Sequence, residues 1–322
     1  MGMDEFTRTF LIPQAAGRWR WPVLDGRYKG IAYMLAASVL FALMFALPKL
    51  ADAGLNGVQA TFIRYVTGFL TMLPVALWAV RRGAPLATPA WPLIVLRALF
   101  GVSGVSSVIY ATTQMTYADA LAISFADGVF ILLLAGFVLG EKVSTRRWIA
   151  AVVCLSGAVI CAQPSPDLLG KVWMEPAAGF AFLGALIMAG EVIVIKHLTN
   201  RVAATTLLLY TNGLAMLLAA GPALLLFDWP PLAELGYYAL MGPVAIAGQF
   251  LFFLSLRCDD VSALVPYKYS TIVFAAVIGI FVFGQWPDAI SVIGAVMIIG
   301  AGVQLSRLEG RTPKPAVTKE TP

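Results

Sequence analysis

Charged residues are scarce in this chain: Asp, Glu, Lys and Arg make up 12% of its 322 residues, about half the share typical of soluble globular domains. It has one histidine, His197, so neither a zinc cluster nor a histidine-based catalytic triad can be assembled. Three cysteines are too few for a disulfide framework, and no Gly-x-x-x-x-Gly-Lys-Ser/Thr phosphate loop is present. The sequence therefore excludes a soluble enzyme and a nucleic-acid binder, and it predicts neither a cofactor nor a metal site.

Apolar residues dominate instead. They make up 60% of the chain, and the mean hydropathy is +0.85. A helix needs about 20 mainly apolar residues to cross a bilayer. Charge clusters, prolines and glycines divide the sequence into ten such runs: 30–48, 58–80, 92–111, 118–139, 148–162, 177–195, 205–227, 236–256, 261–283 and 289–305. We therefore expect an all-α polytopic membrane protein with ten transmembrane helices.

Lysine and arginine fall mainly on one side of these spans. With a cytoplasmic N-terminus, seventeen of the 22 lie in cytoplasmic segments, and only Lys49 and Lys171 lie on the opposite side. Basic residues beside membrane spans mark the cytoplasmic side. The pattern predicts a multi-pass protein of the cell inner (plasma) membrane with both termini in the cytoplasm.

The two halves of the sequence resemble each other. Ala120 in the fourth span and Ala263 in the ninth stand 143 residues apart, and Gly140 and Gly284, which follow those spans, stand 144 apart. Each half contains five spans, an odd number, so equivalent helices cross the membrane in opposite directions. Inverted repeats of this kind recur in secondary transporters, whose substrate site lies near the midplane between the halves.

The repeat sets the domain boundaries. No connection is longer than the 14 residues of 163–176, so a separate catalytic or nucleotide-hydrolysing module has no room. Prolines among charged residues and threonines predict a disordered end. The expected segments are a cytoplasmic N-terminal segment (1–27), a first five-helix repeat (28–162), an external connection (163–176), a second five-helix repeat (177–306) and a disordered cytoplasmic tail (307–322).

Several motifs carry a family resemblance. They are Phe62-Ile63-Arg64-Tyr65, Leu96-Arg97-Ala98-Leu99, Gly140-Glu141, Pro266-Tyr267-Lys268-Tyr269 and Phe283-Gly284-Gln285-Trp286-Pro287-Asp288. With these motifs the chain resembles the EamA family of the drug/metabolite transporter (DMT) superfamily over about residues 28–306. The resemblance implies a ten-helix carrier in which two inverted five-helix EamA repeats surround a central cavity. Two positions depart from the family: Asp127 stands where members often have Pro, and Gln285 where they commonly have Glu.

Asp127 and Lys268 are the charges predicted nearest the middle of the membrane. At 1.5 Å per helical residue, Asp127 lies about 14 Å from the outer surface in the fourth span, and Lys268 about 10 Å from the cytoplasmic surface in the ninth. A charge at mid-membrane costs about 2.5–3.5 kcal/mol, which makes each a functional candidate. If these repeat-related spans face each other across the cavity, the two charges differ in depth by about 6 Å, within reach of a long lysine. The pair would then recognise a charged or zwitterionic substrate. A buried ion pair that only fixes helix packing is the alternative.

Arg64 and four aromatic residues complete the predicted substrate-binding site. Arg64 lies about six residues into the second span, and snorkelling to the outer surface is its alternative role. Tyr110, Phe125, Tyr267 and Tyr269 are expected around the charge pair, where they could stack on a planar ligand or a cation. Each could instead be a core or lipid-facing residue.

Three further charges lie nearer the membrane surface. Arg97 and Glu191 are within about 6–8 Å of the cytoplasmic side, and we expect them to snorkel or to pair locally. Glu141 ends the fourth span beside Lys142, which favours a helix-end role.

These features predict a secondary active transporter that moves a small organic metabolite across the inner membrane by alternating access. The family resemblance implies an amino-acid-like compound, an S-adenosylmethionine-like compound, a vitamin or a drug as substrate, by import or export. The expected partners are this small molecule, the lipid bilayer, protons or a counter-substrate, and a second copy of the chain in a homodimer. Two alternatives stay open: an uncoupled facilitator or channel for small solutes, and a membrane-embedded lipid enzyme.

Overall fold

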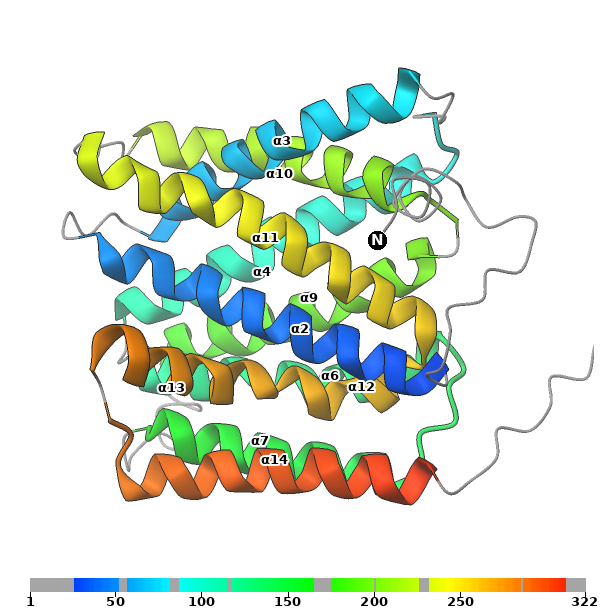
Figure 1. The fold of residues 1–322 in the computed structure, drawn as a ribbon, viewed down its shortest axis with the longest axis vertical. Coiled ribbons are helices and arrows are strands. Elements are labelled where there is room, and N and C mark those ends of the chain that lie inside the picture. Colours follow the sequence, from blue (N-terminus) through cyan, green and yellow to red (C-terminus); the bar gives the residue numbers. More distant parts are fainter. Residues whose placement is uncertain are drawn as a thin grey trace, which may run out of the picture.

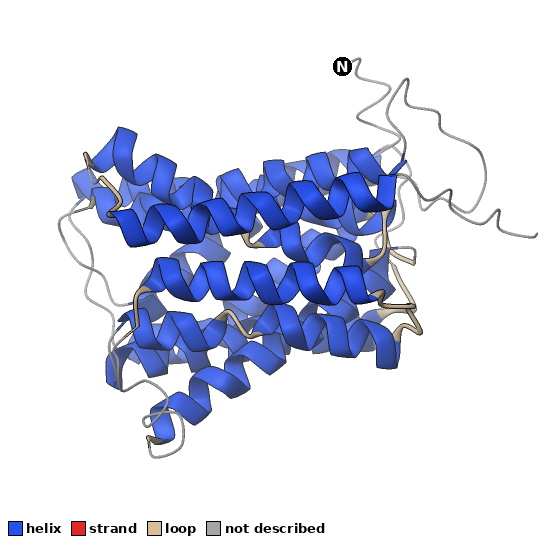
Figure 2. Cartoon of the chain, turned by 90° about the horizontal axis from the view of Figure 1, so that it is seen from below, coloured by secondary structure: helices blue, strands red, loops and turns tan. Residues whose placement is uncertain are grey.

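A computed structural model describes residues 26–51, 57–81, 87–114, 117–164, 175–199, 201–225, 232–284 and 286–310. These ranges contain helices and their connections only (Figure 2). Most of the expected N-terminal segment, of the external connection and of the C-terminal tail lies outside them. The helices are α2 (Gly26–Ala46), the 3₁₀ helix η1 (Leu47–Leu50), α3 (Gly57–Arg81), α4 (Trp91–Gln114), α5 (Tyr117–Ser124), α6 (Asp127–Val138), α7 (Thr145–Ala162), α9 (Pro176–Thr199), α10 (Ala204–Leu225), α11 (Leu232–Cys258), α12 (Val261–Lys268), α13 (Ser270–Phe283) and α14 (Ala289–Gly310).

The predicted membrane spans are confirmed in number and order. In the described part of the chain, nine helices are long and apolar enough to cross a membrane, and the shorter apolar helix Ala122–Val138 supplies the tenth span. The fourth and ninth spans differ from the prediction of continuous helices, because each consists of two pieces, α5 with α6 and α12 with α13. The last helix also extends to Gly310, beyond the expected repeat end at residue 306.

Helix packing follows an approximate twofold relation between the two halves. α2 packs along α11, and in the same way its repeat counterpart α9 packs along α4. α3 crosses its own counterpart α10, and α7 lies against its counterpart α14. In Figure 1 these pairs form successive layers, from α3 and α10 at the top to α7 and α14 at the bottom. The contacts therefore have the symmetry of two inverted five-helix repeats.

The same turn closes the fourth and the ninth span. Gly140 and Gly284 both have positive φ angles, 67° and 65°, which glycine adopts without steric strain. The N–H of Gly284 donates to the carbonyls of Gly279 and Ile280 and so satisfies the end of α13. Because the two glycines stand 144 residues apart, this turn is a repeated element of the fold.

Small residues bring α7 and α14 close together, while large apolar residues cover the outside. A Cβ atom on Gly157 of α7 would lie 3.0 Å from the side chain of Ile298 in α14, and such small residues are typical where membrane helices pack. Phe137, Phe281 and Leu225 are 92%, 84% and 87% exposed. These side chains suit contact with lipid, which is as apolar as they are.

The two ends of the bundle differ in charge. α2 and α12 begin, and α6, α9, α11 and α14 end, at one end of the molecule (Figure 1). We call it the basic end, because most described lysines and arginines lie there: Lys29, Arg81, Lys142, Arg146, Arg147, Lys196, Arg201, Arg257 and Arg307. The first described helix begins and the last one ends at this basic end, as an even number of spans requires.

Candidate substrate site at two interrupted helices

The fourth span is interrupted at Phe125 and Ala126, between α5 and α6. The Ala126 N–H donates to the Ile123 carbonyl at 3.0 Å, and the Gly128 N–H to the Phe125 carbonyl at 3.4 Å. These three-residue spacings are of the 3₁₀ type rather than the α type. Asp127 is the first residue of α6, so its carboxylate lies at a helix N-terminus, where the helix dipole favours negative charge.

The ninth span is interrupted at Tyr269, between α12 and α13. Pro266 lies just before it and has no N–H to donate within the helix. Lys268 ends α12, and a helix C-terminus favours positive charge. Tyr269 stands 144 residues after Phe125, so the two interruptions occupy corresponding positions in the two repeats.

The two interruptions contact each other. The Lys268 ammonium forms an ion pair with the Asp127 carboxylate, so the two charges face each other as their depths predict. The hydroxyl of Tyr269 donates to the Phe125 carbonyl at 2.6 Å, and the rings of these two residues meet edge to face at 6.4 Å between centroids. Four of the predicted site residues therefore form one cluster between the halves.

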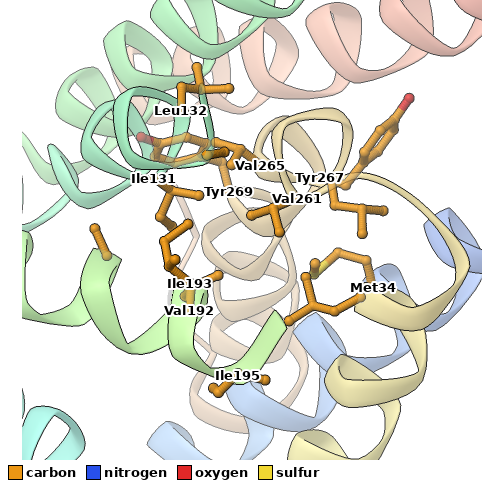
Figure 3. Close-up of a cluster of buried hydrophobic side chains, with 14 of the residues drawn as sticks. Met34, Ile131, Leu132, Val192, Ile193, Ile195, Val261, Val265, Tyr267 and Tyr269 are labelled. Atoms are coloured by element: carbon orange, nitrogen blue, oxygen red, sulfur yellow. The ribbon is translucent and has the colours of Figure 1, made fainter. Parts of the chain in front are cut away.

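The cluster borders an apolar interior. The Asp127 side chain is 9% exposed and that of Lys268 31%, so the ammonium is the more accessible partner. Figure 3 shows apolar side chains of α2, α6, α9 and α12, among them Met34, Ile131, Val192 and Val265. These residues and Lys268 line a cavity of about 10 Å³, room for about one water. A molecule that displaces either member of the pair must replace its charge, because an uncompensated buried charge is strongly unfavourable.

Gly128 permits the approach of Tyr269 to the interruption. A Cβ atom at this position would lie 2.8 Å from Tyr269 Cζ and 2.9 Å from Cε2. Tyr269 is itself only 4% exposed, so its ring has little room to move aside. The absence of a side chain at Gly128 thus allows the aromatic ring to reach the Phe125 carbonyl.

The other predicted site residues make different contacts. The Arg64 guanidinium lies 4.5 Å from the ring centroid of Tyr65, and its buried Nε has no hydrogen-bond partner among the described residues. Tyr110 of α4 packs edge to face on Phe180 of α9 at 4.9 Å. The hydroxyl of Tyr267 donates to the Gly302 carbonyl of α14 at 3.0 Å, so this side chain points away from the charge pair.

Two further polar contacts lie within the membrane-spanning part of the protein. Arg97 and Glu191 form an ion pair at 3.6 Å, so the expectation that they pair locally is confirmed. The buried amides of Asn212 and Gln249 meet at 3.3 Å between α10 and α11. This amide pair is not predicted from the sequence, because neither residue carries a charge that marks it as unusual in an apolar span.

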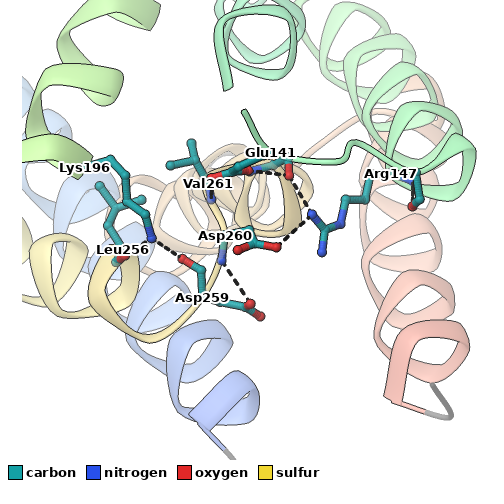
Figure 4. Close-up of polar contacts among 9 residues, drawn as sticks. Glu141, Arg147, Lys196, Leu256, Asp259, Asp260 and Val261 are labelled. Atoms are coloured by element: carbon teal, nitrogen blue, oxygen red, sulfur yellow. Dashed lines mark hydrogen bonds and ion pairs between the residues drawn. The ribbon is translucent and has the colours of Figure 1, made fainter. Parts of the chain in front are cut away.

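A second contact without a clear sequence signal lies at the basic end. The carboxylate of Glu141 accepts hydrogen bonds from the first residues of α12 (Figure 4). Glu141 is recognisable from the sequence as a helix-end residue, but its partners include backbone N–H groups, which leave no sequence signal.

The described residues offer no metal site, since they contain no group of three or more His, Cys, Asp or Glu side chains placed to hold an ion. The three cysteines are free thiols. What the site offers is one cation and one carboxylate, held by one helix from each half.

Comparison with known proteins agrees with this architecture. The model of the EamA-like transporter family matches residues 28–162 and 176–306. The chain is 26% identical to the S-adenosylmethionine uptake transporter of Rickettsia prowazekii, over 84% of this chain and 90% of that protein. It is 27% identical to the pseudopaline exporter CntI of Pseudomonas aeruginosa, over 88% and 98%. It is also 27% identical to a riboflavin transporter of Rhizobium johnstonii, over 89% and 94%.

A solved crystal structure has the same fold. It superimposes with a TM-score of 0.72 at 18% sequence identity, covering 89% of this chain and 99% of the other.

Proposed function

The chain belongs to the EamA-like transporter family of the DMT superfamily, and from this membership we propose that it is a secondary active carrier. It moves a small charged or zwitterionic metabolite across the inner membrane by alternating access. The substrate binds where the two interrupted helices meet, with Asp127 and Lys268 as the central residues. Phe125 and Tyr269 contribute to the same site, and Arg64 is a candidate for a separate contact with the substrate.

The observation that carries this proposal is the ion pair between Asp127 and Lys268. One member comes from each repeat, so the pair spans the boundary that alternating access must open. A zwitterion can place its anionic group on Lys268 and its cationic group on Asp127. It thereby exchanges one ion pair for two, and neither protein charge is left unpaired.

The relatives define the first compounds to test. Their names cover S-adenosylmethionine, pseudopaline and riboflavin. S-adenosylmethionine carries a carboxylate, an ammonium and a sulfonium group, so its carboxylate and one of its two cationic groups match a site that offers one cation and one carboxylate. We therefore place it, together with free amino acids, ahead of uncharged vitamins.

The proposed orientation places the basic end in the cytoplasm. Lysines and arginines beside membrane spans favour that side, and the described residues of this kind gather at that end. A gradient or an exchanged counter-substrate supplies the energy. Asp127 is the candidate proton acceptor if protons are coupled.

The test compares metabolites in cells and medium for strains that express wild type, Asp127→Asn or a control variant. Gly136→Ala is a suitable control, because a Cβ there meets nothing closer than 3.6 Å. Membrane abundance is matched between strains. We expect wild type and Gly136→Ala to redistribute the same compound. The flux through Asp127→Asn should be at least about tenfold lower, because one charged contact with the substrate is lost.

Two results would contradict the proposal. Equal redistribution by Asp127→Asn would remove this residue from the substrate site. Flux of the compound in purified, reconstituted protein that ignores both proton and counter-substrate gradients would favour a facilitator over a coupled carrier.

A further inference from the structure

The carboxylate of Glu141 caps the first turn of α12 from the other half of the protein. Its Oε1 accepts from the Val261 N–H at 2.9 Å, and its Oε2 accepts from the Ser262 N–H at 3.0 Å and from the Ser262 hydroxyl at 2.6 Å. A carboxylate at a helix N-terminus is stabilised both by these free N–H groups and by the helix dipole. Glu141 follows α6 in the first repeat, whereas α12 belongs to the second.

A second contact between the halves lies beside the first. Arg147, at the start of α7, donates to Asp260 at 3.2 Å and to the Ser262 hydroxyl at 2.7 Å (Figure 4). Within the second repeat, the Lys196 ammonium donates to the carbonyls of Leu256 and Asp259 at 2.5 and 2.6 Å. The turn between α11 and α12 is thus bound by Lys196 of α9 within the second repeat. Glu141 and Arg147 bind the start of α12 from the first repeat.

The two ends of the molecule differ in how the interrupted helices meet. At the basic end, α12 packs against α6 and α7. By the repeat symmetry, α5 should pack against α13 and α14 at the opposite end, but in the described residues no contact of comparable extent joins them. Among the described residues, the two interrupted spans therefore pack extensively on each other at the basic end alone, and this is the end that carries the Glu141 contact.

The sequence has the same asymmetry. The residue 144 positions after Glu141 is Gln285, which is uncharged and lies outside the described residues. A carboxylate makes stronger hydrogen bonds to N–H groups than a neutral amide does. The first repeat therefore supplies a charged cap for which the second repeat has no equivalent in sequence.

The contact is reachable from the solvent side. A hollow of about 360 Å³ is lined by Leu139, Glu141, Lys196, His197, Arg201 and Asp260. Behind the contact, toward the ion pair, lies the small apolar cavity that includes Val265, which is only 3% exposed. Glu141 thus stands between a polar hollow at the basic end and the interior.

We infer that Glu141 is a positioning residue for transport, whose carboxylate holds the carrier closed at its basic end and must leave the start of α12 when that end opens. The inference rests on the proposed function for its place in a transport cycle. The closure itself is a property of the protein without substrate. A merely structural cap would affect folding alone, whereas this role affects which side of the membrane reaches the interior.

The test measures access to a reporter thiol at position 265. The full chain, with its three cysteines replaced by alanine and Val265→Cys added, is labelled in membranes with a membrane-impermeant maleimide. An Arg307→Cys chain, whose exposed residue lies at the basic end, shows which membrane preparation presents that end. Glu141→Gln and Asp288→Asn are compared in this background. Asp288 also caps a helix, by accepting from the Ser291 N–H and the Gln163 amide, but at the opposite end.

We expect Glu141→Gln to raise the labelling rate from the basic end by about tenfold or more, because losing hydrogen bonds to a charged group shifts a two-state equilibrium by that order. Asp288→Asn should leave the rate unchanged. Unchanged labelling in a folded Glu141→Gln protein overturns the inference, as does an equal rise in both variants, which indicates general loosening. Labelling needs no substrate, so the result can be interpreted even if the protein is not a carrier. Conversely, if Glu141→Gln does not change labelling, the proposal that the protein is a carrier is unaffected.

Discussion

The hydroxyl of Tyr269 donates a hydrogen bond to the backbone carbonyl of Phe125 at 2.6 Å, and these two residues occupy the same position in the two repeats. Each residue interrupts its own span, and the side chain of Tyr269 satisfies the backbone carbonyl at the other interruption. The contact joins the halves directly beside the Asp127–Lys268 pair, so its contribution to stability and transport can be measured by mutation.

Replacing Tyr269 with Phe keeps the ring and removes the hydroxyl that pairs with the Phe125 carbonyl. We expect a loss of about 0.5–1.5 kcal/mol in the free energy of unfolding, the usual net contribution of one hydrogen bond, together with reduced transport. The Gly128 N–H still donates to the Phe125 carbonyl in this variant. Tyr267→Phe is the control, because it loses a hydrogen bond to Gly302 at 3.0 Å outside the cluster. Unfolding in detergent and vesicle uptake give the two readouts; equal transport by both variants would contradict a special role for Tyr269.

Gly128→Ala should destabilise the protein, since the new methyl group would lie 2.8 Å from Tyr269 Cζ. Overpacking of this kind costs about 1–3 kcal/mol. Gly136→Ala, in the same helix, gains similar helix propensity and meets no atom closer than 3.6 Å, so it should be neutral or stabilising. Thermal unfolding midpoints of the two purified variants compare them directly, and a Gly128→Ala protein as stable as Gly136→Ala would show that the ring can move.

The ion pair can be dissected with Asp127→Asn, Lys268→Gln and the double variant. Lys268→Gln leaves the more buried Asp127 charge unpaired and should cost up to about 3 kcal/mol. Asp127→Asn should cost less, because the Lys268 side chain is 31% exposed. The double variant should recover most of this stability, since neither charge remains.

Transport separates the two roles of the pair. If Asp127 and Lys268 bind substrate, the double variant stays inactive despite its recovered stability. Uptake by the double variant at the wild-type rate would instead show that the pair only fixes helix packing.

Arg64 offers a contrast with Arg97. Both arginines have a buried Nε without a hydrogen-bond partner among the described residues, but the Arg64 guanidinium lies over the Tyr65 ring rather than beside a carboxylate. Arg64→Gln should therefore leave stability near that of wild type. Arg97→Gln removes the partner of Glu191 and should be less stable. If Arg64 binds an anionic group of the substrate, Arg64→Gln raises the KM for transport by about tenfold or more, the loss of one charged hydrogen bond. An unchanged KM would contradict this assignment.

The stability of the turn before α14 should depend on pH through Asp288. Hydrogen bonds from the Ser291 side chain and N–H, and from Gln163, lower the pKa of its carboxyl group below the ordinary 3.8. A lowered pKa in the folded state contributes stability above the unfolded pKa, and this contribution disappears as the pH falls through the folded value. Wild type should therefore exceed Asp288→Asn in unfolding midpoint at pH 6 and approach it progressively as the pH falls below 3.8. A difference that stays constant across this range would contradict the effect.

Hydropathy and charge determine most of what the sequence predicts about the fold. Each span is an apolar run of the length that a bilayer requires, and the one-sided lysines and arginines match the basic end. The pairing of Asp127 with Lys268 is also predictable, because depth and repeat symmetry place both charges near the same level. These features follow from residue type and spacing alone.

The helix interruptions do not follow from residue type. Phe125 and Tyr269 are aromatic residues in apolar runs, and only Pro266 hints at a break. A tertiary contact supports the first of them, because the Tyr269 hydroxyl supplies the hydrogen bond that the irregular Phe125 carbonyl accepts. Glu141 is missed for a related reason: its partners lie 120 residues away and two of its three bonds go to the backbone.

The Asp127–Lys268 ion pair has a net charge of zero, and this affects how transport responds to the membrane potential. Moving one elementary charge across a membrane potential of 100 mV involves about 2.3 kcal/mol. A carboxylate and an ammonium that stay paired cancel, so the potential does no net work on them when an empty carrier reorients. Voltage dependence of the loaded step, recorded as a transport current, would then report the charge of the cargo rather than that of this pair.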